Sequence, residues 1–214
     1  MPTLSEADSK RLLAGFGLPV VEGRQVADAD AAVAAAAELG GPVVVKLCGP
    51  GVAHKTERGL VHVGVAGDDA VRLVAGELLG AAQPSDGLVT LLVERMVRGS
   101  RELIAGLTRD EQFGMTVMLG VGGILAEALA AVAFRLAPIE PVDAEDLIED
   151  LGVERLLGPV RGEPALDRDA LAGVLLALSR AGAAHPELRS ADVNPLIVVD
   201  GRPVAVDALV EVDT

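Results

Sequence analysis

The sequence predicts an α/β protein in which helices and strands are mixed along 214 residues. The apolar, β-branched run Val43–Val45 precedes a glycine-containing loop and a second strand-like run at Leu60–Val65, which predicts two strands joined by a loop. The Ala-rich segment Asp28–Glu38 is followed by Gly40 and Gly41, a pattern typical of a helix with a glycine C-cap. A chain of this length forms one large domain or two small lobes.

Composition and charge limit the function. Half of the residues are hydrophobic but only 1% are aromatic, so the core must consist of Ala, Val and Leu. The net charge of −14 and the lack of aromatic platforms argue against a nucleic acid polymer as partner. No apolar run is long enough to span a bilayer, and the N-terminus lacks a secretory signal pattern. The single Cys48 excludes an intrachain disulfide, which fits a reducing cytoplasm. From these observations we expect a cytoplasmic protein with no membrane contact.

Further elements are predicted by caps, turns and apolar runs. Helices are expected from an N-cap at Ser5, with an acid three residues on at Asp8, to about Gly15, and over Asp68–Leu79, Val142–Leu151 and Asp167–Ala184. Strands are expected at Leu88–Val93, Glu102–Leu107 and Phe113–Leu119, the last two as an antiparallel pair. A glycine turn at Gly122 and Gly123 leads into a helical segment, which fits a generic anion site or a plain strand-to-helix turn.

The stretch Pro42–Val65 carries the first candidate site. Lys46 follows the strand-like run, and the loop after it contains several glycines together with His54 and Lys55. A cation facing a glycine loop suits a nucleotide phosphate, because backbone N–H groups can approach oxygens where no Cβ intervenes. The loop lacks the G-x-x-x-x-G-K-[ST] pattern of a Walker A motif. The alternative is an ordinary hairpin with a solvated lysine and histidine.

The C-terminal stretch carries a second candidate site. Two β runs flank Asp200–Gly201, a strong signal for a type I′ hairpin turn. Counting back from this turn, Asn194 faces Asp207, so a carboxamide and a carboxylate should share one face of the hairpin. Oxygen ligands in this arrangement suit Mg²⁺. The alternative is that Asn194 caps a turn and Asp207 is solvated.

Taken together, these segments resemble the ATP-grasp fold. More narrowly, the chain resembles the nucleotide-binding β subunit or domain of the NDP-forming acyl-CoA synthetases, the ADP-forming acetate–CoA ligases; succinyl-CoA synthetase β subunits are more distant relatives. The segments LLAGFGLPV, GGPVVVKLCGPGVAHKT, LLVERMV, FRLAPI, LLGPVRGEP and DVNPLIVV carry the resemblance in the family's order. It implies two lobes with mixed and antiparallel sheets closing over a nucleotide, at residues 1–93, with a short leading helix, and 94–214.

The resemblance also implies roles for individual residues. The implied ATP/ADP site contains Lys46, Lys55, Glu94, Met96, Val97, Glu102, Gly122 and Gly123. Within it, Lys46 contacts the phosphates, the segment Glu94–Val97 forms a hinge that reads adenine mostly through its backbone, and Glu102 lies near the ribose. The implied Mg²⁺ ligands are Asn194 and Asp207, with Asp192 beside them. His54 resembles a histidine that is phosphorylated on a mobile loop during turnover.

The implied reaction converts acyl-CoA, phosphate and ADP into the acid, CoA and ATP. The CoA-binding part belongs to a separate α subunit or domain, which implies a hetero-oligomer. Two departures from the family pattern are Leu60, where a second glycine is usual, and Ser190, where a glutamate is frequent. They leave open a non-catalytic, nucleotide-binding regulatory paralogue. A third alternative is an ATP-grasp ligase that joins an acid to an amine, but it does not account for the His54–Lys55 pair.

Overall fold

The computed structural model describes residues 3–52, 55–123, 131–160 and 162–213, which form two compact units. The N-terminal unit contains Thr3–Asp8 and Val21–Met96, and the C-terminal unit contains Ser9–Val20 and Val97–Thr214. This division differs from the expected boundary between residues 93 and 94. The last strand of the N-terminal unit continues beyond residue 93, and the segment that follows Asp8 packs with the C-terminal part of the chain. Helix α1 (Glu6–Ala14) therefore contributes residues to both units.

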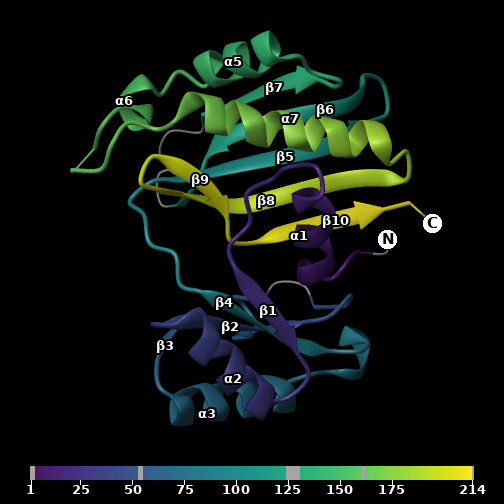
Figure 1. Ribbon diagram of the computed structural model, residues 1–214. Coiled ribbons are helices and arrows are strands. Elements are labelled where there is room, and N and C mark those ends of the chain that lie inside the picture. Colours follow the sequence, from purple (N-terminus) through teal and green to yellow (C-terminus); the bar gives the residue numbers. More distant parts are fainter. Residues whose placement is uncertain (1–2, 53–54, 124–130, 161, 214) are drawn as a thin grey trace. The chain divides into compact units, whose positions relative to one another are not determined.

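The N-terminal unit is built on a four-stranded antiparallel sheet with the order β1-β4-β2-β3 (Figure 1). Its strands are β1 (Gly23–Val26), β2 (Val43–Cys48), β3 (Val61–Val65) and β4 (Thr90–Arg95). Its helices are α2 (Ala29–Leu39), α3 (Asp68–Gly80) and the short 3-10 helix η1 (Pro84–Asp86). The predicted strand–loop–strand arrangement is confirmed, because β2 and β3 pair on either side of the glycine loop.

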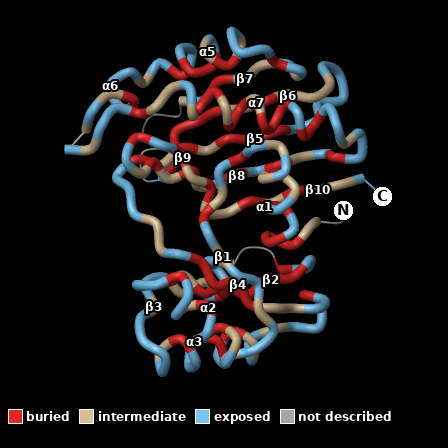
Figure 2. Tube along the Cα trace, viewed as in Figure 1, coloured by how far each residue is buried: buried red, intermediate tan, exposed pale blue. Residues whose placement is uncertain are grey.

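The two faces of this sheet differ in chemistry. The face under α2 and α3 carries the buried apolar side chains of β2 and β4: Val43, Val45, Leu47, Leu91 and Val93. Because side chains alternate along a strand, the opposite face carries Lys46, Cys48, Leu92 and Glu94. On that face Cys48 and Leu92 pack with Ala7 of α1. Both strands are mostly buried (Figure 2), so two charged side chains lie inside the protein.

The C-terminal unit contains a larger antiparallel sheet with the order β10-β8-β5-β6-β7, and β9 pairs with β8. Its strands are β5 (Glu102–Asp110), β6 (Gly114–Val121), β7 (Val132–Leu136), β8 (Leu188–Val199), β9 (Arg202–Ala205) and β10 (Ala208–Val212). Its helices are α5 (Pro141–Asp150), α6 (Glu154–Leu157) and α7 (Arg168–Ala184). Helix α7 packs along β5 and β6 (Figure 1) and buries Leu171, Val174, Leu175 and Leu178 completely.

The caps and turns follow the predicted chemistry. The side chain of Asp28 accepts a hydrogen bond from the backbone N–H of Ala31 at the start of α2, and Gly40 ends this helix with φ of 71°. Asp200 and Gly201 have φ of 49° and 82°, and the residues on either side of them pair across the turn. The predicted two-residue hairpin turn is therefore confirmed.

Several features differ from the sequence-based expectation. Lys46 lies within β2 and not at its end, because the strand continues to Cys48. The single β run expected after Gly201 is divided into β9 and β10, which both pair with β8. Strands β1 and β7 and helix α6 were not expected. Each is only four or five residues long, and the two strands are held by pairing with β4 and β6, contacts that no local pattern reveals.

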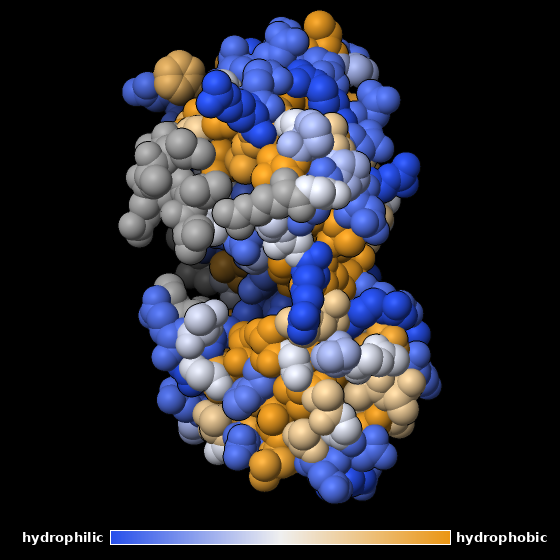
Figure 3. Space-filling view, turned by 90° about the vertical axis from the view of Figure 1, so that its left-hand side faces the viewer, coloured by the Kyte–Doolittle hydropathy of each residue, from blue (hydrophilic) through white to orange (hydrophobic). Residues whose placement is uncertain are grey.

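Among the residues that the structure describes, no helix combines the length and the apolarity needed to cross a bilayer. Figure 3 shows one face of the molecule, on which hydrophilic and hydrophobic side chains are interspersed.

Candidate functional site

Lys46 lies at the centre of a buried group of charges in the N-terminal unit. Its Nζ atom is 2.6 Å from Glu6 Oε1 and 2.8 Å from Glu94 Oε2. The side chains of Lys46, Glu6 and Glu94 are 7%, 2% and 3% exposed. Glu94 reaches the lysine because Val44 pairs with Glu94 while Lys46 pairs with Leu92, which places the two charges diagonally on one face of the sheet. The structure thus fixes the position of the predicted phosphate-binding ammonium group.

Glu6 also binds a second lysine. The Nζ atom of Lys55 is 2.5 Å from Glu6 Oε2, so the two oxygens of one carboxylate bind two different ammonium groups. Glu6 is the first residue of α1, and the N-terminus of a helix favours a carboxylate. The predicted cap at Ser5 is supported, since the N–H of Asp8 donates to Ser5 Oγ at 3.2 Å.

The role of Glu6 was missed in the sequence. Acidic residues are common in the first turn of a helix, so Glu6 looked like an ordinary part of the cap. The two lysines that it binds lie 40 and 49 residues further along the chain. No local spacing connects these positions, and only the packing of α1 on the sheet brings them together.

The glycine loop after β2 packs closely against η1. A Cβ atom on Gly51 would lie 2.1 Å from the backbone oxygen of Ser85, and the N–H of Gly51 donates to the backbone oxygen of Asp86. Glycine at this position is therefore required by packing within the protein, and its N–H group is already used. The predicted phosphorylation site, His54, lies outside the described residues.

The predicted hinge Glu94–Val97 begins within a strand, and its role in binding adenine stays a prediction. Glu94 and Arg95 still belong to β4, and the carboxylate of Glu94 is committed to Lys46. The backbone N–H of Met96 donates to the backbone oxygen of Pro42 at 3.3 Å. The strand thus uses the backbone N–H of Met96 within the protein. The change from one unit to the other falls between Met96 and Val97.

In the C-terminal unit, Glu102 and the glycine pair lie together, and their role in nucleotide binding stays a prediction. The N–H of Gly122 donates to the backbone oxygen of Glu102 at 2.8 Å. A Cβ atom on Gly123, which has φ of 61°, would lie 2.8 Å from Glu102 Oε2. The helix expected after this turn falls on residues 124–130, which lie outside the described part.

The predicted metal ligands lie on the C-terminal hairpin. Leu196 pairs with Ala205 on one side and Val193 with Ala208 on the other, and this unchanged register puts Asn194 opposite Asp207. Asp192 lies two residues before Asn194, and both are exposed. Within the described residues no group of three or more His, Cys, Asp or Glu side chains is placed to hold a metal ion. Asparagine supplies a carbonyl oxygen as ligand, so the donor set of two carboxylates and one amide still suits Mg²⁺.

The electrostatics of Asp192 fit a cation site. Protein atoms around the carboxylate partly desolvate it and raise its pKa, although the side chain still reaches solvent. The negative charge of Asp207 raises the pKa of Asp192 further. A carboxylate whose ionisation is opposed by a neighbouring negative charge favours a bound cation beside it.

The two departures from the family pattern have structural explanations. Leu60 is 1% exposed and belongs to the core of the N-terminal unit, and its N–H donates to the backbone oxygen of Lys55 at 2.7 Å. Ser190 pairs across the sheet with Glu211 and donates a hydrogen bond of 2.8 Å to its Oε2 atom. A carboxylate is therefore present beside Ser190, on the neighbouring strand.

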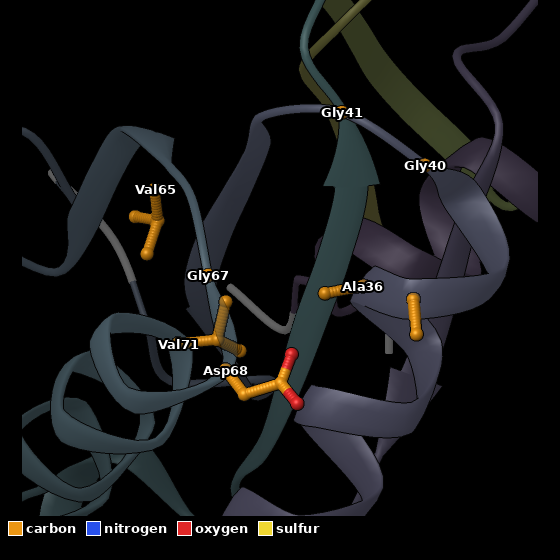
Figure 4. A pocket seen from close by; sticks show the side chains of 8 residues that line it. Ala36, Gly40, Gly41, Val65, Gly67, Asp68 and Val71 are labelled. Carbon is orange, nitrogen blue, oxygen red and sulfur yellow. The ribbon is translucent and has the colours of Figure 1, made fainter.

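The N-terminal unit also contains a cavity that none of the predicted site residues lines. It has a volume of about 200 Å³ and lies between the end of α2 and the start of α3 (Figure 4). Its lining includes Ala36, Gly40, Gly67 and Asp68. Among the described residues that line it, Asp68 alone is charged, and its charge would repel a phosphate. We do not assign the nucleotide to this cavity.

Comparison with known proteins decides the family. The sequence pattern of the ATP-grasp domain matches residues 2–212. The chain belongs to the ATP-grasp domain family.

Two ATP-grasp relatives are ADP-forming acetate–CoA ligases. The chain is 34% identical over 208 residues to the β subunit of acetate–CoA ligase [ADP-forming] I of Pyrococcus furiosus, with 96% of this chain and 90% of that one covered. It is 36% identical over 208 residues to acetate–CoA ligase [ADP-forming] I of Archaeoglobus fulgidus. That match covers 92% of this chain but only 30% of the longer protein.

A solved structure confirms the ATP-grasp fold. The dinucleotide-forming acetyl-coenzyme A synthetase 1 of Ca. Korarchaeum cryptofilum matches with a TM-score of 0.82 and 34% identity, covering 97% of this chain and 92% of that one. That structure is a complex with coenzyme A and Mg-AMPPCP. Its phosphohistidine segment points towards the nucleotide binding site.

Proposed function

We propose that this chain is the ATP-grasp subunit of an ADP-forming acyl-CoA synthetase of the acetate–CoA ligase type. The observation that carries the proposal is the similarity to the Pyrococcus furiosus β subunit over nearly the whole of both chains. The enzyme interconverts acyl-CoA, phosphate and ADP with the acid, CoA and ATP. Its composition and single buried cysteine fit a cytoplasmic enzyme.

In the proposed mechanism the chain transfers a phosphoryl group between ATP and His54. A ring nitrogen of neutral His54 attacks the γ-phosphorus, the new P–N bond forms, and the P–O bond to ADP breaks. The reverse step makes ATP from ADP and phosphohistidine. Such a transfer depends on positioning and on neutralising the phosphate charge. Lys46, fixed between Glu6 and Glu94, supplies a positive charge in a water-poor environment.

Other residues would bind the rest of the nucleotide. Lys55 supplies a second cation, Glu102 would contact the ribose, and Gly122 and Gly123 would contact the phosphates. Asn194, Asp207 and Asp192 would hold Mg²⁺, which when bound neutralises charge on the phosphate oxygens. Adenine would be read at the segment Glu94–Val97, mostly through its backbone.

The proposal requires a partner. The chain corresponds to 30% of the Archaeoglobus fulgidus ligase, so most of such an enzyme lies in other domains. We propose that CoA binding and acyl transfer occur in a separate α subunit and that the two chains form a hetero-oligomer. Phosphohistidine carries the phosphoryl group between the two sites.

The test is isotope exchange between labelled ADP and ATP, with Mg²⁺ and the purified chain, with and without a candidate α subunit. We expect exchange that is lost in His54→Ala and in Lys46→Met. Acyl-CoA synthesis from acid, CoA and ATP should need the α subunit. Nucleotide binding without exchange in either mixture would instead support a regulatory paralogue, and amine-dependent ATP hydrolysis by the chain alone would support a carboxylate–amine ligase.

A further inference from the structure

One carboxylate links β2 to the glycine loop. Lys46 lies on β2 before the loop, and Lys55 lies within the loop, before β3. Both Nζ atoms bind Glu6, at 2.6 Å through Oε1 and at 2.5 Å through Oε2. The Glu6 side chain is 2% exposed, so these contacts are shielded from water.

Without Glu6, the arrangement would be unfavourable. Two ammonium groups held next to each other in a buried place repel, and this repulsion lowers the stability of both charged forms. A carboxylate between them cancels the repulsion and fixes each group with a charge-assisted hydrogen bond. The resulting pair of cations suits the adjacent oxygens of a di- or triphosphate.

Stability alone explains the arrangement poorly. Glu94 already pairs with Lys46 at 2.8 Å, so Lys46 does not need Glu6 as its only counter-charge. Burying a second ion pair, Glu6 with Lys55, costs desolvation free energy that the attraction between the two charges often does not recover. An apolar pair of the same size at these positions would serve packing equally well.

We propose that Glu6 is a positioning residue that makes Lys46 and Lys55 act as one phosphate-binding unit. The inference rests on the proposed nucleotide-binding function. It adds that the two lysines are coupled and that a residue of α1, which contacts no nucleotide in this proposal, controls their joint affinity for phosphate.

The experiment compares ligands that differ in their phosphates. Binding of Mg-ADP to the full chain is measured by calorimetry, and binding of adenosine by NMR titration, for wild type, Glu6→Gln, Glu6→Asp, Lys55→Met and the double variant Glu6→Gln/Lys55→Met. The control Asp30→Asn removes the same charge from an exposed ion pair with Arg72 in the same unit.

We expect Glu6→Gln to lower the affinity for Mg-ADP roughly tenfold, the cost of losing a charge-assisted hydrogen bond that orders the site. Adenosine affinity should be unchanged, Glu6→Asp should recover part of the loss, and Asp30→Asn should bind like wild type. Since Glu6 acts through the lysines, the double variant should lose little more than Lys55→Met alone.

Three outcomes would overturn the inference. Unchanged or tighter Mg-ADP binding in Glu6→Gln would show that Glu6 is irrelevant to the phosphates or competes with them. Equal losses of affinity for adenosine and for Mg-ADP in Glu6→Gln would show that Glu6 has a merely structural role. Additive effects of Glu6→Gln and Lys55→Met would show that the residues are uncoupled. If wild type itself fails to bind Mg-ADP, or if Lys46→Met binds it normally, the proposed function fails instead.

Discussion

Lys46 Nζ on β2 lies 2.8 Å from Glu94 Oε2 on β4, and the two side chains are 7% and 3% exposed. The contact results from strand register, because the residues are two positions apart across an antiparallel pair. In such a buried place the charges interact more strongly than in water. The ammonium group is therefore held in one position before any ligand arrives, as a phosphate-binding group requires.

The first prediction concerns this lysine. Lys46→Met should abolish measurable Mg-ADP binding and lower the free energy of unfolding by about 3 kcal/mol, because it removes the cation shared by two buried carboxylates. Calorimetry and urea denaturation measure the two effects. Arg72→Met, which removes an exposed cation of the same unit, should change neither by a measurable amount.

The second prediction concerns the metal. Asp207→Ala should remove the dependence of nucleotide affinity on Mg²⁺ while the thermal unfolding temperature stays close to that of wild type, because the residue is only partly buried. The measurement is ADP affinity with Mg²⁺ and with EDTA. Asp213→Ala, at an exposed position after β10, serves as the control. A full Mg²⁺ effect in Asp207→Ala would reject the assignment of this residue as a ligand.

The third prediction concerns pH. The bidentate contact with Arg58, at 2.8 and 2.9 Å, holds the pKa of Asp86 below its ordinary value, and the N–H of Gln83 contributes as well. Since the pKa is lower in the folded state, the ionised carboxylate stabilises the fold fully above the unfolded-state pKa of about 3.9. This stabilisation is lost as the pH falls through the lower, folded-state pKa.

Asp86→Asn should therefore lower the free energy of unfolding by about 2 kcal/mol near neutral pH. The difference from wild type should stay constant down to about pH 5 and narrow below about pH 4. Chemical denaturation from pH 7 to pH 3 measures it. A difference that is independent of pH over this range would contradict the ion-pair explanation.

The fourth prediction concerns Cys48. Burial raises the pKa of this thiol, which is 1% exposed and packs with Ala7 and Leu92. At pH 8 the folded protein should react with Ellman's reagent far more slowly than the denatured protein, because both the thiolate fraction and access are low. Equal rates in the two states would show that the residue is not packed as described.

Local patterns predicted the elements that local chemistry determines. Asp28 and Gly40 mark the ends of α2, and Asp200–Gly201 defines the hairpin turn. Because the side-chain period of a strand is two, that turn was enough to place Asn194 opposite Asp207. The metal-site hypothesis follows from this register and stays a prediction.

Long-range packing determined what could not be predicted. Glu6 meets Lys46 and Lys55 only because α1 packs on the sheet, and Glu94 meets Lys46 only because β2 pairs with β4. The boundary of the units was placed too early because the strand-like apolar run ends at Val93, whereas the backbone of β4 pairs as far as Arg95. Strand pairing, and not local propensity, determines both the contact of Glu94 with Lys46 and the end of β4.

Phosphorylation of His54 is tested by mass spectrometry of the chain after incubation with Mg-ATP, at neutral to alkaline pH so that phosphoramidates survive. We expect phosphate on His54, with transfer back to added ADP, and no phosphate in His54→Ala. The other two histidines are His62, within β3, and His185, at the end of α7. Phosphate on either of them, or full ligase activity of His54→Ala together with its α subunit, would reject the role of His54.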